Sequence, residues 1–508
     1  MSFYNVLSAS VQGMGVDIVK VEVDIGNGLP VFRMVGYLSS EVKEASDRVR
    51  TALKNTGFSL PAKKITVNLS PACVRKRGNG FDIAIAVSIL AAMNAIPVNH
   101  LRDTLFVGEL GLDGTIHPVD GVLSIVEEAR TKGLKKCIVP YDNLAEGRLV
   151  DEIEVWGMKT LEEVCLWTKG EYRDGGEKKI TPPPDENNFL DYSDIKGQEA
   201  VIRATLVAVA GNHNLLFIGP PGAGKTMLAK RIPTILPPLN MEESLEVTKI
   251  YSIAGLVKKD NPLITRRPFR EVNHTSSRAA VIGGGRYPQF GEITLAHKGV
   301  LFLDELAEFQ RGVLDSLREP LEDKEIHLIR QQGNYIYPAD CMVVAASNPC
   351  PCGYYPNLNL CHCTQAQVRN YMGKISQPFL DRIDICSEVG KVDYKSLSRE
   401  KGSYTSAQLR SYVENARKIQ SKRFEKKKIS TNSQMGTEEL KEFCALEKGS
   451  EKLMQAAYEN MNLTARSYHK ILKVARTIAD LDDAQNISEE HIKEAISYRV
   501  PDKKYWGY

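Results

Sequence analysis

Residues 214–230, NLLFIGPPGAGKTMLAK, form the stretch that most constrains the fold of this 508-residue chain. A run of apolar residues leads into a glycine-rich turn, and a lysine, a threonine and a helix-forming segment follow. Gly219–Thr226 matches the pattern G-x-x-x-x-G-K-[ST]. In this pattern the N–H groups of the turn surround phosphates, and the next helix presents its positive end to them. The stretch therefore predicts an α/β domain that binds a nucleotide triphosphate.

Each residue of this pattern has a predicted role in holding ATP and Mg²⁺. The Lys225 ammonium would reach the outer phosphates, and the Thr226 hydroxyl would bind the metal ion. The phosphate-contacting turn comprises Gly219, Pro220, Pro221, Gly222, Ala223 and Gly224.

A second apolar run, Val300–Leu303, predicts a buried strand that ends in two acidic residues. Asp304 is placed to hold Mg²⁺ through water, and Glu305 to orient the attacking water. An acidic pair at this position can also be a simple helix cap. The phosphate-binding pattern upstream favours catalysis.

Three further polar residues lie beside apolar stretches. Asn348 closes the strand-like MVVAAS, and the carboxyl ends of parallel strands face the ligand in such sheets, so it is predicted to polarise the same water. Arg382 lies in FLDRID and Arg466 in LTARSYHK. A lone arginine is most often a solvated surface charge. At an element boundary it can also stabilise the charge on a transferring phosphate, from its own subunit or a neighbour.

The chain divides by composition into several parts. Residues 1–169 predict a mixed α/β domain, with a hairpin formed by 16–25 and 31–36, a helix over 39–57 and a second hairpin whose tip is Asp113-Gly114. Residues 170–188 contain three consecutive prolines and predict a linker. A second α/β region covers 189–395, and 396–508 is predicted to be helical, with Thr and Ser caps.

Composition excludes some classes of protein and leaves others open. The longest apolar stretch, Ile83 to Met93, is too short to span a bilayer, and the N-terminus does not resemble a signal peptide. We therefore expect a cytoplasmic protein without membrane contact. The net charge of +3 neither requires nor excludes nucleic acid.

The chain resembles the AAA+ ATPases, and more narrowly the magnesium-chelatase-like ComM/YifB family. The resemblance is carried by GPPGAGKT, GGGRYPQFGEITLAHKGVLFLDELAEF, SLREPLEDKEIHLIR, AASNPCPCG, FLDRIDI and ARSYHKILKVARTIADL, and near the N-terminus by VEVDIGNGLPVFRMVG and ITVNLSPACVRKRGNGFDIAIAVSILAA. It covers nearly the whole chain. It implies an N-terminal Lon-protease-like α+β domain of the ribosomal S5 domain 2 type, an AAA+ α/β domain with a parallel sheet, and a C-terminal helical lid.

The resemblance also implies roles for single residues. Lys225 and Thr226 would be the Walker A residues, and Asp304 and Glu305 the Walker B pair. Asn348 would be sensor 1, Arg382 the arginine finger that acts on a neighbour's nucleotide, and Arg466 sensor 2 on the lid. Such a finger implies a homo-hexameric ring, and the long segment between the Walker A helix and the Walker B strand would include an inserted hairpin that faces the pore. Relatives tend to have two histidines where this chain has Asn273-His274, which puts any role of the first histidine in doubt.

The Lon-like N-terminal domain lacks the residues of a Ser–Lys peptidase. Gly80 stands where the serine is expected and Ile125 where the lysine is expected. Neither side chain can act as a nucleophile or its base. The domain is therefore interpreted as a scaffold or a nucleic-acid-binding platform.

Two C-x-C pairs in CPCGYYPNLNLCHC predict a structural zinc site formed by Cys350, Cys352, Cys361 and Cys363. His362 is a fifth candidate ligand, and the alternative is a set of free thiols. The six other cysteines are scattered singly and are predicted to be core thiols.

The resemblance favours an ATP-driven motor that acts on DNA through branch migration of recombination intermediates during natural transformation. Basic loops around Arg75–Arg77 and Arg266–Arg270 are candidate phosphate contacts. The alternatives are metal insertion into a porphyrin, ATP-dependent proteolysis, and a nucleotide-gated platform or remodeller of a protein partner.

Overall fold

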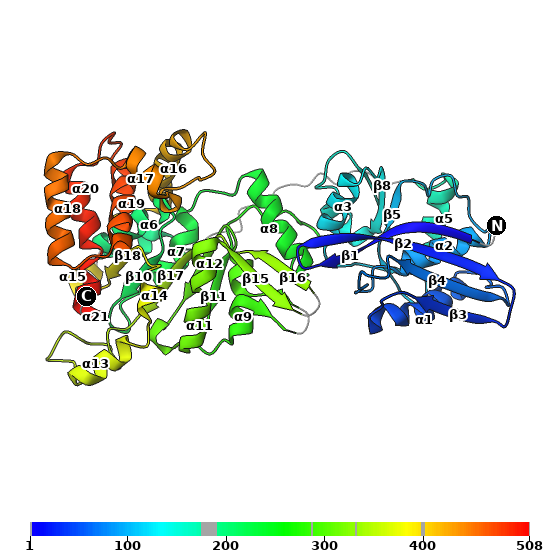
Figure 1. The fold of residues 1–508 in the computed structure, drawn as a ribbon, viewed down its shortest axis with the longest axis horizontal. Coiled ribbons are helices and arrows are strands. Elements are labelled where there is room, and N and C mark those ends of the chain that lie inside the picture. The colour runs from blue at the N-terminus through cyan, green and yellow to red at the C-terminus, as the bar shows by residue number, and fades with distance from the viewer. Residues whose placement is uncertain (1–2, 174–189, 286–287, 331–332, 398–401, 507–508) are drawn as a thin grey trace. The chain divides into compact units, whose positions relative to one another are not determined.

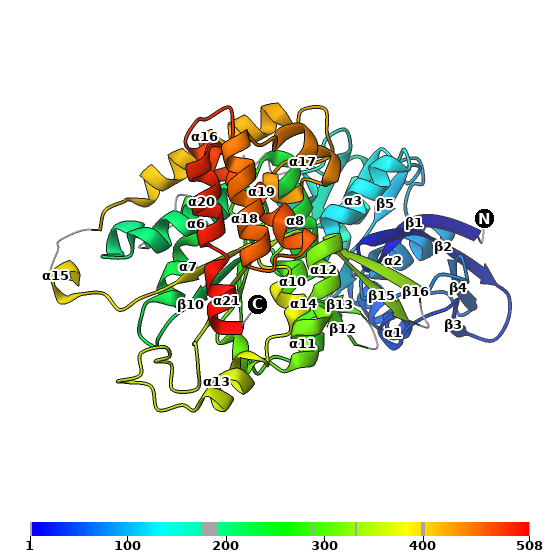
Figure 2. The ribbon, with the colours of Figure 1, turned by 60° about the vertical axis from the view of Figure 1, so that its left-hand side comes forward.

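The computed structural model describes residues 3–173, 190–285, 288–330, 333–397 and 402–506 (Figures 1 and 2). Its contacts separate two compact units, Met1–Pro184 with Met241–Thr265, and Asp185–Asn240 with Arg266–Tyr508. The predicted linker lies, from residue 174 onward, outside the described residues. None of the described helices combines the length and the apolar character that crossing a bilayer requires.

The first unit is built on a seven-stranded mixed sheet with the order β3-β4-β2-β1-β5-β8-β9. Its strands are β1 (Phe3–Gln12), β2 (Gly15–Gly26), β3 (Val31–Val35), β4 (Lys64–Ser70), β5 (Thr104–Phe106), β8 (Lys136–Pro140) and β9 (Glu154–Met158). Helices α1 (Ser40–Asn55), α2 (Asp82–Ala92), α3 (Val122–Thr131), α4 (Leu144–Gly147) and α5 (Leu161–Lys169) pack around it. All residues of α2 are buried, because a helix that is apolar on every side must be covered on every side.

The predicted hairpin between 16–25 and 31–36 is wrong. Strand β4 lies between the two segments, and Val67 of β4 pairs with Val23 of β2 on one side and with Met34 of β3 on the other. The turn residues between the two segments favour a hairpin locally. Strand β4, which comes later in the chain, instead pairs with the edge of β2 on one side and with the edge of β3 on the other. The second predicted hairpin is confirmed: β6 (Glu109–Leu110) pairs with β7 (Ile116–His117) around Asp113-Gly114.

Helix α8 (Met241–Ile253) belongs to the first unit, although the sequence-based boundaries place it in the ATPase domain. It packs on α3. Lys249 forms an ion pair with Glu127 at 2.6 Å, and the Ser252 hydroxyl donates to the buried Glu146 carboxylate. The backbone N–H of Gly121 donates to the Ser252 carbonyl at 3.1 Å. The segment after the phosphate-loop helix thus supplies part of the first unit's packing.

The second unit contains a five-stranded parallel sheet with the order β11-β14-β17-β10-β18, which confirms the predicted parallel α/β sheet. Its strands are β10 (Leu215–Ile218), β11 (Phe269–Val272), β14 (Val300–Leu303), β17 (Met342–Ser347) and β18 (Ile385–Glu388). Two small hairpins are formed by β12 (Gly283–Gly284) with β13 (Gln289–Phe290), and by β15 (Glu325–Arg330) with β16 (Gly333–Pro338).

Helices surround this sheet and form the C-terminal part of the chain (Figure 2). The first group is α6 (Glu199–Gly211), α7 (Lys225–Ile235), α9 (Arg278–Ile282), α10 (Glu292–Leu295), α11 (Arg311–Ser316), α12 (Arg318–Asp323), α13 (Gln365–Met372), α14 (Gln377–Leu380) and α15 (Tyr394–Leu397). The second is α16 (Ser406–Arg423), α17 (Thr437–Phe443), α18 (Lys448–Asn460), α19 (Ala465–Leu481), α20 (Glu489–Ser497) and α21 (Val500–Trp506).

The predicted helix caps in this C-terminal part are confirmed. The Thr464 hydroxyl accepts from the Ser467 N–H at 3.2 Å at the start of α19, and Ser488 caps α20 through the N–H of His491. Such caps satisfy N–H groups that have no partner inside the helix. Helix α19 packs against both α6 and α20, so the C-terminal helices share one core with the sheet's own helices.

Candidate functional site

Three neighbouring strands of the second unit end at the same edge of the sheet. Strands β14, β17 and β10 are parallel and in register, with Leu303 opposite Ala345 and Ile218 opposite Ser347. The phosphate-loop segment follows β10, the acidic pair follows β14 and Asn348 follows β17. Because parallel strands present their carboxyl ends together, the fold brings these predicted residues to one place.

The turn after β10 adopts the conformation that a phosphate-binding loop needs. Gly224, with a φ of +89°, lies in the left-handed region just before α7, where a side chain would be strained. Lys225 is the first residue of α7. Its ammonium donates to the Gly219 carbonyl at 2.7 Å, the Pro220 carbonyl at 3.0 Å and the Asn348 Oδ1 at 3.0 Å. These hydrogen bonds hold the Lys225 ammonium inside the turn whose N–H groups would donate to phosphates.

The Lys225 site is electrostatically tuned by its surroundings. Burial lowers the pKa of Lys225, while the negative charges of Asp304 and Glu305 act in the opposite direction. A phosphate beside this ammonium would add negative charge and favour the protonated form.

Thr226 and Asp304 form the candidate magnesium site. The Thr226 hydroxyl donates to the Asp304 Oδ2 at 2.8 Å, and the other carboxylate oxygen accepts from the Glu305 N–H at 2.9 Å. A hydroxyl and a carboxylate are the oxygen donors that Mg²⁺ prefers beside phosphates. The residues present therefore fit the ion, which would neutralise phosphate charge when bound.

Glu305 is held by His274, a residue without a predicted role. Its backbone has a φ of +54°, in the left-handed region, and its carboxylate Oε2 lies 2.9 Å from the His274 Nδ1. Asn273, the position where relatives tend to have a first histidine, instead accepts hydrogen bonds from the Thr275 N–H and hydroxyl, both at 3.0 Å. The second residue of the pair thus makes the contact with Glu305.

The two arginines predicted to act on a nucleotide lie together on one carboxylate. Arg382 follows α14 and donates to Glu322 and to the Pro378 carbonyl. Arg466, near the start of α19, forms an ion pair with the other oxygen of Glu322 at 2.9 Å. The contacts described for Lys225 and Thr226 instead run to Asn348 and Asp304. The structure therefore forms two separate groups of predicted site residues.

Two further site residues, His274 and Glu322, had no role assigned to them from the sequence. His274 follows β11, the strand beside β14, so assigning β11 to the sheet would have placed its next residues near Glu305. Glu322 lies in a short helix of ordinary charged residues, and no local pattern distinguishes it from a solvated acid.

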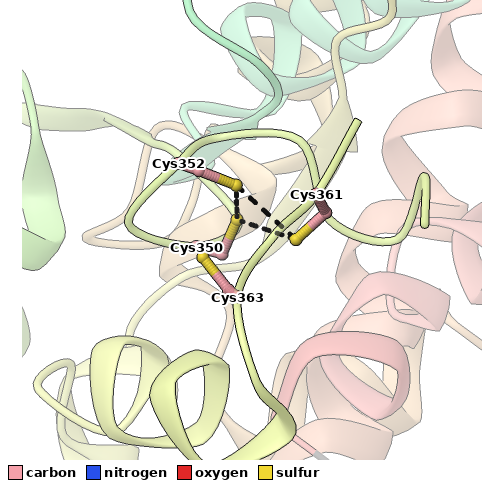
Figure 3. Close-up of side chains that lie close together, drawn as sticks. All are labelled: Cys350, Cys352, Cys361 and Cys363. Carbon is pink, nitrogen blue, oxygen red and sulfur yellow. Dashed lines mark hydrogen bonds between the residues drawn. The ribbon is translucent and has the colours of Figure 1, made fainter. Parts of the chain in front are cut away.

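The four predicted cysteines converge into one cluster (Figure 3). The Sγ of Cys350 lies 3.4 Å from that of Cys352 and 3.8 Å from that of Cys361, and all four sulfurs lie within 4.8 Å of one another. Four thiolates about 2.3 Å from one zinc ion are separated by about 3.8 Å. The cluster therefore fits a tetrahedral metal site, while His362 is exposed and lies outside this group.

The cysteine loop packs against the phosphate loop. Gly353, with a φ of +84°, has no room for a side chain, since a Cβ there would lie 2.4 Å from the Pro221 Cδ. Asn348 lies two residues before the first cysteine. A metal in the cluster would thus stiffen a segment that joins Asn348 to the phosphate-binding turn.

We predict about one zinc ion per chain in the purified protein by elemental analysis. The substitution Cys361→Ser should remove the metal, lower the melting temperature and weaken ATP binding through the Gly353–Pro221 contact. Cys444→Ser, at a buried thiol outside the cluster, is the matched control and should keep the zinc. A metal-free protein with unchanged melting temperature and ATP affinity would contradict the site.

Comparison with protein families identifies three matching segments. Residues 21–143 match "Subunit ChlI of Mg-chelatase", residues 191–397 match "Magnesium chelatase, subunit ChlI", and residues 403–499 match "Magnesium chelatase, subunit ChlI C-terminal".

Relatives match over their full length. A protein of Mycobacterium tuberculosis is 40% identical over 500 residues, 98% of this chain and 99% of the relative. YifB of Escherichia coli is 40% identical over 506 residues, 99% of this chain and 98% of the relative. Competence protein ComM of Haemophilus influenzae is 40% identical over 508 residues, 98% of each chain.

The chain belongs to the ComM/YifB family of magnesium-chelatase-like proteins. This AAA+ membership supports ATPase activity with ATP and Mg²⁺, in agreement with the residues assembled at the edge of the sheet.

The N-terminal part of this ComM/YifB protein is also similar to Lon protease 2 of Bacillus subtilis, with 29% identity over 151 residues, 30% of this chain and 25% of the relative. A Cβ on Gly80 would lie 3.0 Å from Val107 and 4.0 Å from Val119. Ile125 is buried in an apolar cluster. The space beside Gly80 is therefore lined by valines, and neither position carries a nucleophile or a base.

Three basic residues in the two basic loops of this family member make internal contacts. Lys76 is buried, and its ammonium donates to the carbonyls of Pro71 and Val74. Arg267 donates to the Pro237 carbonyl at 2.7 Å, and Arg270 of β11 pairs with Glu292 at 2.6 Å. Lys76, Arg267 and Arg270 are thus held by contacts within the chain, and contact of these loops with phosphates stays a prediction.

The prediction that the scattered cysteines are core thiols is mostly confirmed. Cys137, Cys165, Cys341, Cys386 and Cys444 are buried. Cys73 is exposed, so the prediction is wrong for this residue. It lies in the loop after β4, where the chain leaves the sheet.

Proposed function

We propose that this ComM/YifB protein is a ring-forming ATPase that couples ATP hydrolysis to movement on DNA, with branched recombination intermediates as the substrate. The contacts of Lys225 with Asn348 and of Thr226 with Asp304 are the observation that carries the ATPase part. They join residues that follow three neighbouring strands into a single site for a triphosphate and its metal ion.

The DNA part is supported by the family. The relative in Haemophilus influenzae is named a competence protein, and the sequence resemblance implies branch migration during natural transformation. Magnesium insertion into a porphyrin is the main alternative. The cysteine cluster argues against it, because we do not expect such a cluster in the ATPase subunit of a true chelatase.

We propose that the hairpin β15–β16 contacts the DNA. Ile329 and Ile336 are 74% and 54% exposed, although isoleucine is usually buried. The neighbouring Arg330 is exposed and carries a positive charge. Such a surface can contact sugars through its apolar atoms and phosphates through its charge, without reading the base sequence.

We predict that branched DNA stimulates ATP turnover. The test measures ATPase activity alone, with single-stranded, duplex and four-way-junction DNA of equal nucleotide content, and with a porphyrin. Junction DNA should give the largest increase. The increase should fall as salt is raised, because contacts to phosphates release counterions.

A matched pair of variants makes this test specific. Glu305→Gln should retain binding to the junction but lose turnover, while Glu308→Gln, an exposed acid nearby, should behave as wild type. If no DNA changes turnover and the porphyrin does, the chelatase alternative replaces the proposal. If neither has an effect, a protein partner becomes the favoured substrate.

A further inference from the structure

Glu322 forms ion pairs with both Arg382 and Arg466, which lie far apart in the sequence. It lies near the end of α12, Arg382 follows α14, and Arg466 is the second residue of α19. Arg382 pairs with the Oε2 of its carboxylate, and Arg466 pairs with the Oε1 at 2.9 Å. Each guanidinium therefore has its own oxygen, and the carboxylate sets the distance between the two positive groups.

Without Glu322, charge repulsion would drive Arg382 and Arg466 apart. They border a cavity of about 520 Å³ whose wall is rich in cations. Lys470 lies in this wall beside Arg466 and has its partner in Asp384, at 3.1 Å. Two guanidiniums without a shared anion would repel each other and the neighbouring ammonium groups. The cations Lys324, Lys428 and Lys473 also line the cavity. Its acidic residues are Glu322, Asp381 and Asp384.

Glu322 is suited to act as that anion. Burial raises the pKa of Glu322, but the hydrogen bond from Arg466 and the charge of Arg382 outweigh this effect and hold the pKa below its ordinary value. The carboxylate is therefore charged at neutral pH. With both arginines paired to one carboxylate, the group retains one net positive charge, and both arginines line the cavity.

We propose that Glu322 is a positioning residue that holds Arg382 and Arg466 as one unit, offered to the triphosphate bound by a neighbouring copy of the chain. This inference rests on the proposed function, in which Arg382 acts on a neighbour. It adds that Arg466 acts on the same nucleotide as Arg382, and that neither is correctly placed without Glu322.

The first test separates positioning from folding. Glu322→Ala should lower kcat by about 10- to 100-fold, because small misplacements of a catalytic group cost up to about 10²-fold. Its affinity for a fluorescent ATP analogue and its melting temperature should stay unchanged. Glu322→Gln keeps the shape and the hydrogen-bond acceptor and should recover part of the loss. Asp323→Asn, the exposed next residue, is the matched control and should behave as wild type.

The second test asks whose nucleotide the unit serves. A Lys225→Ala chain cannot bind ATP but keeps the Glu322 unit, whereas a Glu322→Ala chain binds ATP and lacks the positioned arginines. In randomly mixed rings about a quarter of the interfaces join an intact unit to an intact ATP site. Mixing equal amounts of the Lys225→Ala and Glu322→Ala chains should therefore restore turnover toward about a quarter of the wild-type rate.

The outcomes are distinguishable from those of the proposed function. Turnover of the mixture that equals the sum of its parts would overturn the inference, as would a Glu322→Ala variant with wild-type kcat. The turnover of the mixed rings is measured without DNA. A lack of stimulation by DNA would therefore count against the proposed movement on DNA and not against the role of Glu322. Activity of the Lys225→Ala chain alone would instead count against the ATP site.

Discussion

Replacing Lys225 by alanine is expected to abolish ATP binding and with it all turnover. The ammonium is the cation of the phosphate loop and contacts Asn348, the residue predicted to polarise the attacking water. Removing one preorganised donor from a site for developing charge costs about 10²–10³-fold in rate. Here the same group also contributes to binding, so the loss in kcat/KM should exceed that range. Calorimetry with a non-hydrolysable ATP analogue and a phosphate-release assay measure the two effects.

The matched control for this prediction is Lys230→Ala. Lys230 lies on the same helix α7, is largely exposed, and forms a surface ion pair with Glu271 at 2.9 Å. Such pairs contribute at most about 1 kcal/mol to stability, so the control should keep its fold, ATP affinity and turnover. A Lys225→Ala protein with wild-type turnover would show that the phosphate-loop assignment is wrong.

Replacing Arg382 by alanine is expected to leave ATP binding intact and to stop hydrolysis in assembled rings. Its guanidinium belongs to the Glu322 group and not to the contacts around its own chain's Lys225. An arginine that stabilises the charge on a transferring phosphate is worth about 10³–10⁵ in kcat. The expected signature is therefore a lost kcat with an unchanged affinity for the ATP analogue.

Mixed rings provide the decisive measurement for Arg382. If each Arg382 serves a neighbour, increasing amounts of Arg382→Ala chain should reduce turnover more steeply than simple dilution. Arg311→Ala, at an exposed arginine that lies near Asp315, should only dilute the wild-type protein without added loss. Turnover that falls in strict proportion to the wild-type fraction would contradict action across an interface.

The nucleotide site was the most predictable part of the molecule. Its strands, turn and helix are each specified by residues that are adjacent in the chain: an apolar run, glycines where the turn is tight, and a lysine at the start of a helix. Because parallel strands end at one edge of a sheet, the ends of three predicted strands were enough to anticipate the meeting of Lys225, Asp304 and Asn348. The four cysteines were predictable for a similar reason, since one short loop contains all of them.

Pairings between distant segments were not predictable in the same way. The predicted hairpin near the N-terminus failed because β4 competes for the same edges, and its pairing depends on the whole sheet. The contacts of His274 with Glu305 and of Glu322 with Arg382 join side chains that no periodicity relates. The docking of α8 on the first unit depends on the surface that α3 presents.

The sequence by itself determined which local structures form and which chemistry they carry: a phosphate-binding turn, an acidic strand end, a cluster of thiols and a helical C-terminal part. Only the tertiary structure decided which arginines share a carboxylate, which residue holds Glu305 and which unit receives α8. Local structure follows from backbone preferences within a few residues. Contacts between distant side chains depend instead on how packed elements bring their ends together, and this is a property of the complete fold.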